Sequence, residues 1–128
     1  MAARVLLIED NPPSLELMCY LLEHFGHTPI RARDGLSGLE AMRTERPDLV
    51  VCDIDLPRLD GYSLAARAKA DAELRAIPLI AVTALAMVGD RDRAIRAGFD
   101  GYLSKPIEPE TFVRDVEQFL PRCEREDI

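Results

Sequence analysis

The chain has 128 residues and a formal net charge of −7, with 48% apolar and 30% charged residues. That length fits one domain with one core, and this balance of apolar and charged residues is ordinary for a folded globular protein. The acidic excess argues against nucleic acid or an anionic membrane surface as a partner, because both are polyanions. Apolar runs stay well short of the ~20 residues of a membrane-spanning helix, so we expect a cytoplasmic protein.

Short apolar runs alternate along the chain with longer segments of helical period. The first expected strand covers residues 5–8 and ends on Glu9-Asp10. Two prolines at positions 12 and 13 then begin a helix that Gly26 ends. The apolar residues that recur at helical spacing in this helix are Leu15, Met18, Leu22 and Phe25. The N-terminal quarter of the chain therefore predicts one strand followed by one helix.

The same alternation continues through the middle of the chain. A weaker strand over residues 28–32 precedes a helix in which Leu36, Leu39 and Met42 share a face. The apolar run at 49–52 follows Pro47 and ends on Asp53, and four successive apolar residues are typical of a parallel strand that is covered on both faces. Residues 61–72 form the next expected helix. Its inward positions are expected to be Tyr62, Leu64, Ala65 and Ala68.

The C-terminal part adds two further strands and two further helices. One strand covers residues 78–82 and ends on Thr83, and another covers 101–104 and ends on Lys105-Pro106. A short helix at about 88–97 separates them, and Gly98 ends it. The last helix is expected to begin at Pro109. Its apolar stripe comprises Phe112, Val113, Val116, Phe119 and Leu120.

The order of elements is thus strand and helix five times over. Right-handed crossovers between successive strands place all strands parallel in one sheet, with helices on both faces. The predicted fold class is α/β, a three-layer (βα)5 sandwich around a five-stranded parallel sheet. Residues 1–121 are assigned to this domain and residues 122–128 to a short charged tail, with no output domain.

Polar side chains follow four of the strands, and the carboxyl ends of parallel strands meet at one rim of the sheet. Glu9 and Asp10 follow the first strand, Asp53 the third, Thr83 the fourth and Lys105 the fifth. Three carboxylates close together repel one another unless a cation lies among them, and an all-oxygen site with few protein ligands suits Mg²⁺. A cation, an ammonium, a hydroxyl and a carboxylate nucleophile together are equipped to accept a phosphoryl group.

The remaining histidines and cysteines carry weaker signals. His24 and His27 flank the end of the first helix, and without further ligands at matching spacing we interpret them as surface residues rather than a zinc pair. The three cysteines show no CxxC spacing. Cys19 and Cys52 lie in apolar stretches, so we expect reduced core thiols, whereas Cys123 is expected to reach solvent.

Several motifs, in order, resemble the receiver domain of two-component response regulators. They are Glu9-Asp10, Asp53 with Leu56-Pro57 and Asp60-Gly61, Val82-Thr83-Ala84, and Tyr102-Leu103-Ser104-Lys105-Pro106. The similarity runs from Arg4 to about Leu120. It implies a flavodoxin-like sheet with strand order 2-1-3-4-5, an order for which the chemotaxis receiver is a standard example. The run from Ala84 to Gly98 is similar to single-domain receivers of bacterial cell-cycle relays.

This resemblance also implies a role for each site residue. Asp53 would accept a phosphoryl group from a sensor histidine kinase or a histidine phosphotransfer protein, and the domain would catalyse only its own modification. Mg²⁺, for which Mn²⁺ can substitute, would be held by Asp10, Asp53 and the carbonyl of Asp55, with Glu9 acting through water. Thr83 and Lys105 would bind the phosphoryl oxygens.

The resemblance further implies a conformational switch and an output surface. Tyr102 would change rotamer together with Thr83, and the face made by the fourth helix, fifth strand and fifth helix would bind a downstream protein. The Lys105-Pro106 bond is expected to be cis. At Asp55 many receivers carry a neutral residue, so this carboxylate is a departure that adds negative potential beside the expected metal.

Other interpretations of the same residues were weighed. Asp53-Ile54-Asp55 after a strand also resembles the nucleophile motif of haloacid-dehalogenase-type phosphatases, but that family places its nucleophile on the first strand and its acidic pair late. A flavodoxin-like flavin binder must cradle a phosphate in its first loop, where Glu9-Asp10 would repel it. A receiver excised from a hybrid kinase or a larger regulator, and a receiver that only binds partners, complete the alternatives.

Overall fold

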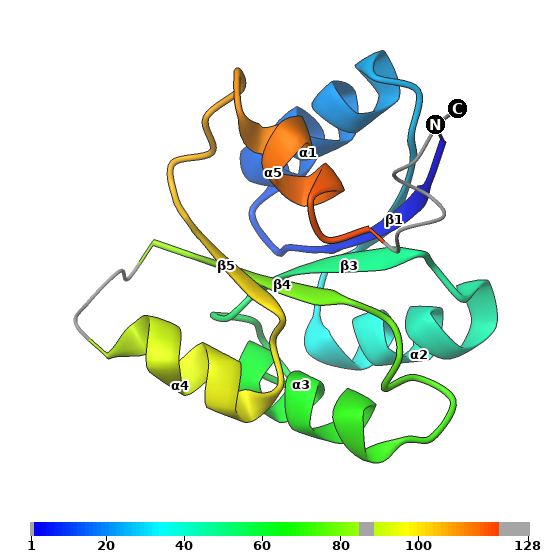
Figure 1. The fold of residues 1–128 in the computed structure, drawn as a ribbon, viewed down its shortest axis with the longest axis vertical. Coiled ribbons are helices and arrows are strands. Elements are labelled where there is room, and N and C mark those ends of the chain that lie inside the picture. The colour runs from blue at the N-terminus through cyan, green and yellow to red at the C-terminus, as the bar shows by residue number, and fades with distance from the viewer. Residues whose placement is uncertain (1, 85–88, 121–128) are drawn as a thin grey trace.

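The computed structural model describes residues 2–84 and 89–120. Within these residues, strands and helices alternate in the predicted order (Figure 1). The elements are β1 (Arg4–Ile8), α1 (Pro12–His24), β2 (Thr28–Ala32), α2 (Gly35–Glu45), β3 (Leu49–Asp53), α3 (Gly61–Ala70), β4 (Leu79–Thr83), α4 (Asp90–Ala97), β5 (Gly101–Ser104) and α5 (Phe112–Glu117).

All neighbouring strands pair in parallel, in the order β2-β1-β3-β4-β5. This order confirms the predicted flavodoxin-like α/β fold. β3 lies at the centre of the sheet, and all five of its residues are buried. In the pairing register Asp53 stands opposite Val82, one residue before the end of β4. The carboxyl ends of β1, β3, β4 and β5 therefore meet at one rim, as predicted.

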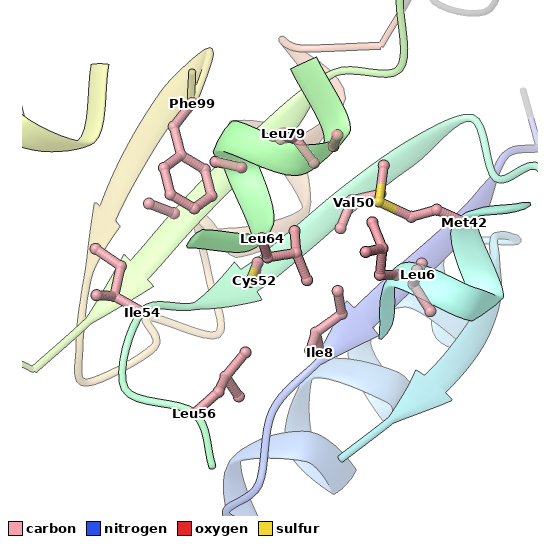
Figure 2. Packing of buried hydrophobic residues seen from close by; sticks show 14 of the residues in the cluster. Leu6, Ile8, Met42, Val50, Cys52, Ile54, Leu56, Leu64, Leu79 and Phe99 are labelled. Atoms are coloured by element: carbon pink, nitrogen blue, oxygen red, sulfur yellow. The ribbon is translucent and has the colours of Figure 1, made fainter. Parts of the chain in front are cut away.

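Helices cover both faces of the sheet, with α1 and α5 on one face and α2, α3 and α4 on the other (Figure 1). Successive strand residues point to opposite faces, so each central strand contributes to two cores. On β1, Val5 and Leu7 pack in the core under α1 and α5, whereas Leu6 and Ile8 pack in the core under α2 and α3. Figure 2 shows this second core, in which Leu6 and Ile8 meet side chains of the covering helices.

Side-chain caps fix where the helices next to the rim begin. Asn11 Oδ1 accepts a hydrogen bond from the Ser14 N–H at 3.1 Å, and proline occupies the first turn of α1. Proline is favoured there because its ring presets the helical φ and the missing N–H would have no partner in the helix. Asp60 caps α3 in the same way through the Ser63 N–H, at 2.8 Å. Both caps lie directly beside the polar strand ends.

Two details of the predicted helices are wrong. Phe25 was predicted to continue the apolar period of α1, but it is the residue at the C-terminal cap, with φ −97° and ψ 15°, and it is 55% exposed. α5 begins at Phe112 rather than at Pro109, because the preceding residues form a turn in which Thr111 N–H donates to Glu108 O. The predicted start of the fourth helix, at Val88, lies outside the described residues.

The cysteine prediction is confirmed where the structure describes it. Cys19 and Cys52 are buried free thiols, and Cys123 lies outside the described residues. Burial, followed by the negative charge of Asp53, raises the pKa of the Cys52 thiol well above its usual value. Such a thiol stays neutral and behaves as a small core residue. In the described part of the chain, no helix is long and apolar enough to cross a membrane.

His27 is buried, so its interpretation as a surface residue is wrong. Its Nδ1 accepts a hydrogen bond from the Ala3 N–H at 3.1 Å, and its Nε2 lies 2.7 Å from Glu117 Oε2. The imidazole thus joins the chain just before β1 to the last residue of α5. A polar side chain enters the core here because both of its nitrogens have partners. His24, by contrast, is exposed as predicted.

Replacing His27 by alanine is expected to lower the free energy of unfolding by roughly 2 to 4 kcal/mol, because the Ala3 N–H loses its partner and a cavity is left. Chemical denaturation at neutral pH measures this. His24→Ala is the matched control, since that ring is exposed, and it should change stability by less than about 0.5 kcal/mol. Equal losses in the two variants would show that the buried contacts of His27 do not stabilise the fold.

Candidate functional site

Most of the polar residues at the strand ends line one open cleft of about 380 Å³. β1 leads into Glu9 and Asp10, β3 ends at Asp53, and Lys105 directly follows β5. The full lining comprises Glu9, Asp10, Asn11, Asp53, Asp55, Ala84 and Lys105. Most of these residues were expected at one rim because parallel strands end at the same edge of a sheet.

Three carboxylates in the cleft form a compact cluster. Oxygen atoms of Glu9, Asp10 and Asp53 all lie within 4.8 Å of one another. Glu9 is 1% exposed and Asp53 6%, whereas Asp10 is exposed to solvent. Two buried acids with a third at the opening make a site that is rich in carboxylate oxygens at its base and accessible from outside.

Lys105 is the cation that faces this cluster. Its Nζ lies 2.8 Å from Glu9 Oε1 and 3.2 Å from Asp53 Oδ2. Burial alone would lower the pKa of Lys105, but the ion pair with Glu9 and the charge of Asp53 outweigh burial and raise it. The Lys105–Pro106 peptide bond is cis, as expected from the sequence. The ammonium is therefore held charged against the carboxylate at the end of the central strand.

Glu9 has the most perturbed acidity in the cleft. Burial and its hydrogen bond with Asp53 raise the pKa of Glu9 to about 7, against the opposing effect of Lys105. Glu9 Oε2 accepts a hydrogen bond from the Asn11 N–H at 3.2 Å. Glu9 Oε1 forms the ion pair with Lys105 but lacks an aligned hydrogen-bond donor among the described residues. One lysine does not balance three neighbouring carboxylates.

This raised pKa sets the pH dependence of stability without metal. Between pH 4.5 and about 7 Glu9 is ionised in the unfolded chain but protonated in the folded protein, so stability falls as pH rises through this window. We expect a loss on the order of 3 kcal/mol across it. The test compares the free energy of unfolding of the wild type and of Glu9→Gln across this pH range in the presence of chelator. The other ionisable groups are present in both proteins, so the difference between the two pH profiles is the contribution of Glu9. Parallel pH profiles would contradict the expectation.

The arrangement fits a divalent cation. Carboxylate oxygens are the ligands that Mg²⁺ prefers, and it usually binds through few protein groups while keeping several waters. The compact triad, its opening to solvent and the incompletely satisfied Glu9 Oε1 meet these requirements. The triad is therefore a candidate metal site, as the sequence indicated.

The loop after β3 folds back onto the end of that strand and thereby positions Asp55. The Asp55 N–H donates to Asp53 Oδ1 at 3.1 Å, and its side chain is exposed in the wall of the cleft. The Gly61 N–H donates to Ile54 O at 2.8 Å. A Cβ at Gly61 would lie 2.7 Å from Ile54 Cα, so only glycine permits this approach.

Besides Pro106, two of the predicted residues lie outside the cleft lining. Thr83 is buried at the end of β4, beside the strand of Asp53, and its carbonyl accepts a hydrogen bond from the Lys105 N–H at 2.9 Å. Tyr102 is half-buried on β5 and lines a different pocket, between β5 and α5. Asn11, which caps α1 and supports Glu9, was not predicted as part of the site; its position just before two prolines is the signal for the cap.

The fold and the cleft define a class of protein, and comparison with known families identifies it. The sequence model of the response regulator receiver domain matches residues 5–117. The chain therefore belongs to the receiver domain family of response regulators. It is a phosphoacceptor of two-component signalling, which implies a histidine kinase as partner, and not a turnover enzyme such as the phosphatase alternative.

Individual relatives agree with this assignment. The polar-differentiation response regulator DivK of Brucella anthropi is 42% identical over 120 residues, which cover 94% of this chain and 98% of that protein. DivK of Brucella ovis is 41% identical over the same coverage. These relatives match the resemblance to cell-cycle receivers that the sequence indicated.

Solved structures show the same fold. A response regulator from Chloroflexus aurantiacus aligns with a TM-score of 0.89 at 29% identity and covers 95% of this chain and 100% of its own. The receiver domain of a Pseudomonas aeruginosa sensor histidine kinase aligns with a TM-score of 0.84 at 32% identity, covering 93% and 98%. That structure has a magnesium ion coordinated in its active-site cleft.

Proposed function

We propose that Asp53 is the phosphoryl acceptor of this receiver and that the donor is a phosphohistidine of a sensor histidine kinase or a histidine phosphotransfer protein. The observation that carries the proposal is the contact of Lys105 Nζ with Asp53 Oδ2, at 3.2 Å, inside the carboxylate cluster. A carboxylate that is almost buried, at the end of the central strand and opposite a charged ammonium, is placed for chemistry rather than for packing.

The proposed reaction is a transfer from nitrogen to oxygen. A carboxylate oxygen of Asp53 forms a bond to phosphorus while the bond between phosphorus and the donor imidazole breaks, and the electron pair leaves with that imidazole. Lys105 and Thr83 bind the phosphoryl oxygens and offset their charge. The Asp55 N–H, which already donates to Asp53 Oδ1, holds the carboxylate in one orientation during the attack.

A magnesium ion completes the proposed site, and Mn²⁺ can substitute for it. Asp10, Asp53 and the carbonyl of Asp55 would hold it, with Glu9 acting through water. When bound, the ion supplies charge neutralisation for the incoming phosphoryl group. The magnesium in the Pseudomonas receiver and the acidic triad of this chain support this assignment.

In this proposal, phosphorylation changes a surface of the receiver that binds another protein. Thr83 and Tyr102 form the switch, and the face made by α4, β5 and α5 binds the downstream protein. Tyr102 lies on β5 and packs against the core on the α4 side of the sheet, where a rotamer change would alter that face. The protein works in the cytoplasm, where histidine kinases hold their phosphohistidine.

Labelling by a small phosphodonor tests the proposed function. Wild-type protein incubated with acetyl phosphate and Mg²⁺ should gain one phosphoryl group by intact mass, and hydroxylamine should remove it because acyl phosphates are labile to this nucleophile. Excess chelator should abolish labelling. Absence of labelling with Mg²⁺, or steady phosphate release from a phosphomonoester, would contradict the proposal.

Asp55→Asn is expected to weaken Mg²⁺ binding to the unmodified protein by about two- to fivefold, because an exposed charge near the ion is removed. It should also raise the rate of labelling by acetyl phosphate at saturating Mg²⁺, since less negative charge opposes the donor. Calorimetry and intact mass measure the two effects. Asp60→Asn, in the same loop but engaged in capping α3, is the control. No change in either quantity would show that Asp55 contributes only its backbone.

A further inference from the structure

A second pocket lies away from the carboxylate cleft, where β5 meets the turn before α5 and α5 itself. It has a volume of about 250 Å³. Its lining comprises Tyr102, Leu103, Ser104, Ile107, Glu108, Thr111, Phe112 and Asp115. The pocket thus joins the residue proposed as the switch to the first two turns of α5.

The size and floor of the pocket suit a single side chain. Pockets for small-molecule ligands usually measure about 300 to 1,000 Å³, so this one is below that range. Phe112 is buried and Leu103 and Ile107 are half-buried, so part of the floor is apolar. Such a floor packs well against the stem of one long side chain that is presented by another protein.

The polar groups of the pocket select the charge of that side chain. Glu108 is exposed and Asp115 is half-buried, and both line the opening. None of the described residues that line the pocket is a lysine or an arginine. The whole chain carries a net charge of −7, so the wider field also favours a basic partner.

We propose that this pocket binds one arginine side chain of the downstream protein. The aliphatic stem of the arginine would pack on the apolar floor, and its guanidinium would pair with Glu108 and Asp115. Arginine fits better than lysine because its planar guanidinium binds carboxylates through two N–H groups in a fixed geometry. This proposal rests on the proposed function, because it specifies which side chain of the downstream protein would bind at the face made by α4, β5 and α5.

The position of Tyr102 connects this pocket to the phosphoryl site. Tyr102 lines the pocket from β5, and its neighbour in the paired strand is Ala81, two residues before Thr83. The Tyr102 side chain packs in the core on the α4 side of the sheet, so a shift of β5 at this residue would change both that core and the shape of the arginine pocket. Any such coupling is reciprocal, so an occupied pocket would also favour the phosphorylated state.

The test uses a blocked tripeptide with arginine between two leucines, and a matched peptide in which citrulline keeps the shape but removes the charge. NMR titration of the unmodified full chain should show saturable shifts at Tyr102, Thr111 and Asp115. The arginine peptide should bind about fivefold more tightly than the citrulline peptide, since two partly exposed ion pairs are made. Equal binding of both peptides, or no saturable shift, would overturn the proposal.

Variants of the acidic residues test whether the arginine peptide binds at this pocket. Glu108→Gln combined with Asp115→Asn should remove most of the preference for arginine over citrulline, whereas Glu110→Gln, an exposed neighbour outside the pocket lining, should retain it. A loss that is equal in Glu110→Gln would mean that general charge rather than the pocket attracts the peptide, and would overturn the proposal. These titrations contain no phosphodonor, so their outcome is separate from that of the labelling experiment, and either can fail alone.

Discussion

Asp53→Asn protein is expected to gain no phosphoryl group from acetyl phosphate and Mg²⁺ under conditions that label the wild type fully. The amide has almost the same shape as the carboxylate, so the buried site should fold, but it lacks the nucleophilic oxygen that forms the acyl phosphate. Intact mass measurement gives the result directly.

The matched control for this variant is Asp60→Asn. Asp60 lies in the same loop, and its carboxylate caps α3 by accepting from the Ser63 N–H at 2.8 Å. Asparagine is an equally good cap, so this variant should remain folded and label at the wild-type rate. Labelling of Asp53→Asn at the rate of Asp60→Asn would place the acceptor elsewhere.

Lys105→Ala is expected to lower the labelling rate at saturating Mg²⁺ by about 100-fold, the scale seen when one preorganised charge-stabilising group is removed. The ammonium lies within 3.2 Å of Asp53 and within 2.8 Å of Glu9, so its loss leaves three carboxylates to repel the donor. Rates follow from intact mass over a time course.

Two further variants separate the role of Lys105 in the cleft from the effect of removing any paired lysine. Lys105→Arg keeps the charge with a different geometry and should recover only part of the rate. Lys69→Ala removes a different paired lysine, which contacts Asp100 at 3.1 Å away from the cleft, and should leave the rate unchanged. Full labelling by Lys105→Ala would show that this ammonium does not bind the phosphoryl group.

The strands and the chemistry of their shared rim could be predicted because they depend on simple physical rules. Continuous apolar runs such as residues 49–52 indicate strands covered on both faces, and parallel strands deliver their next residues to the same edge. Asp53 and Lys105, 52 positions apart, were therefore placed together before any distance was known, and they are in contact. The resemblance to receivers supplied the order of the strands, which hydrophobic patterning alone does not determine.

The parts that escaped prediction depend on tertiary contacts. The burial of His27 follows from partners 24 and 90 positions away, Ala3 and Glu117, which no local pattern reveals. The exposure of Phe25 depends on the residue at which α1 ends, and helix ends are poorly determined by periodicity. The raised pKa of Glu9 likewise needs both its burial and the nearness of Asp53.

Chemical trapping of the phosphorylated residue tests the central claim most directly. Wild-type protein labelled with acetyl phosphate and Mg²⁺ is reduced with borohydride, which converts an acyl phosphate of aspartate to homoserine, and is then digested and sequenced by mass spectrometry. Asp53 as acceptor predicts homoserine at position 53 and unchanged aspartate at positions 10, 55 and 60. Homoserine at any other position, with residue 53 still aspartate, would contradict it.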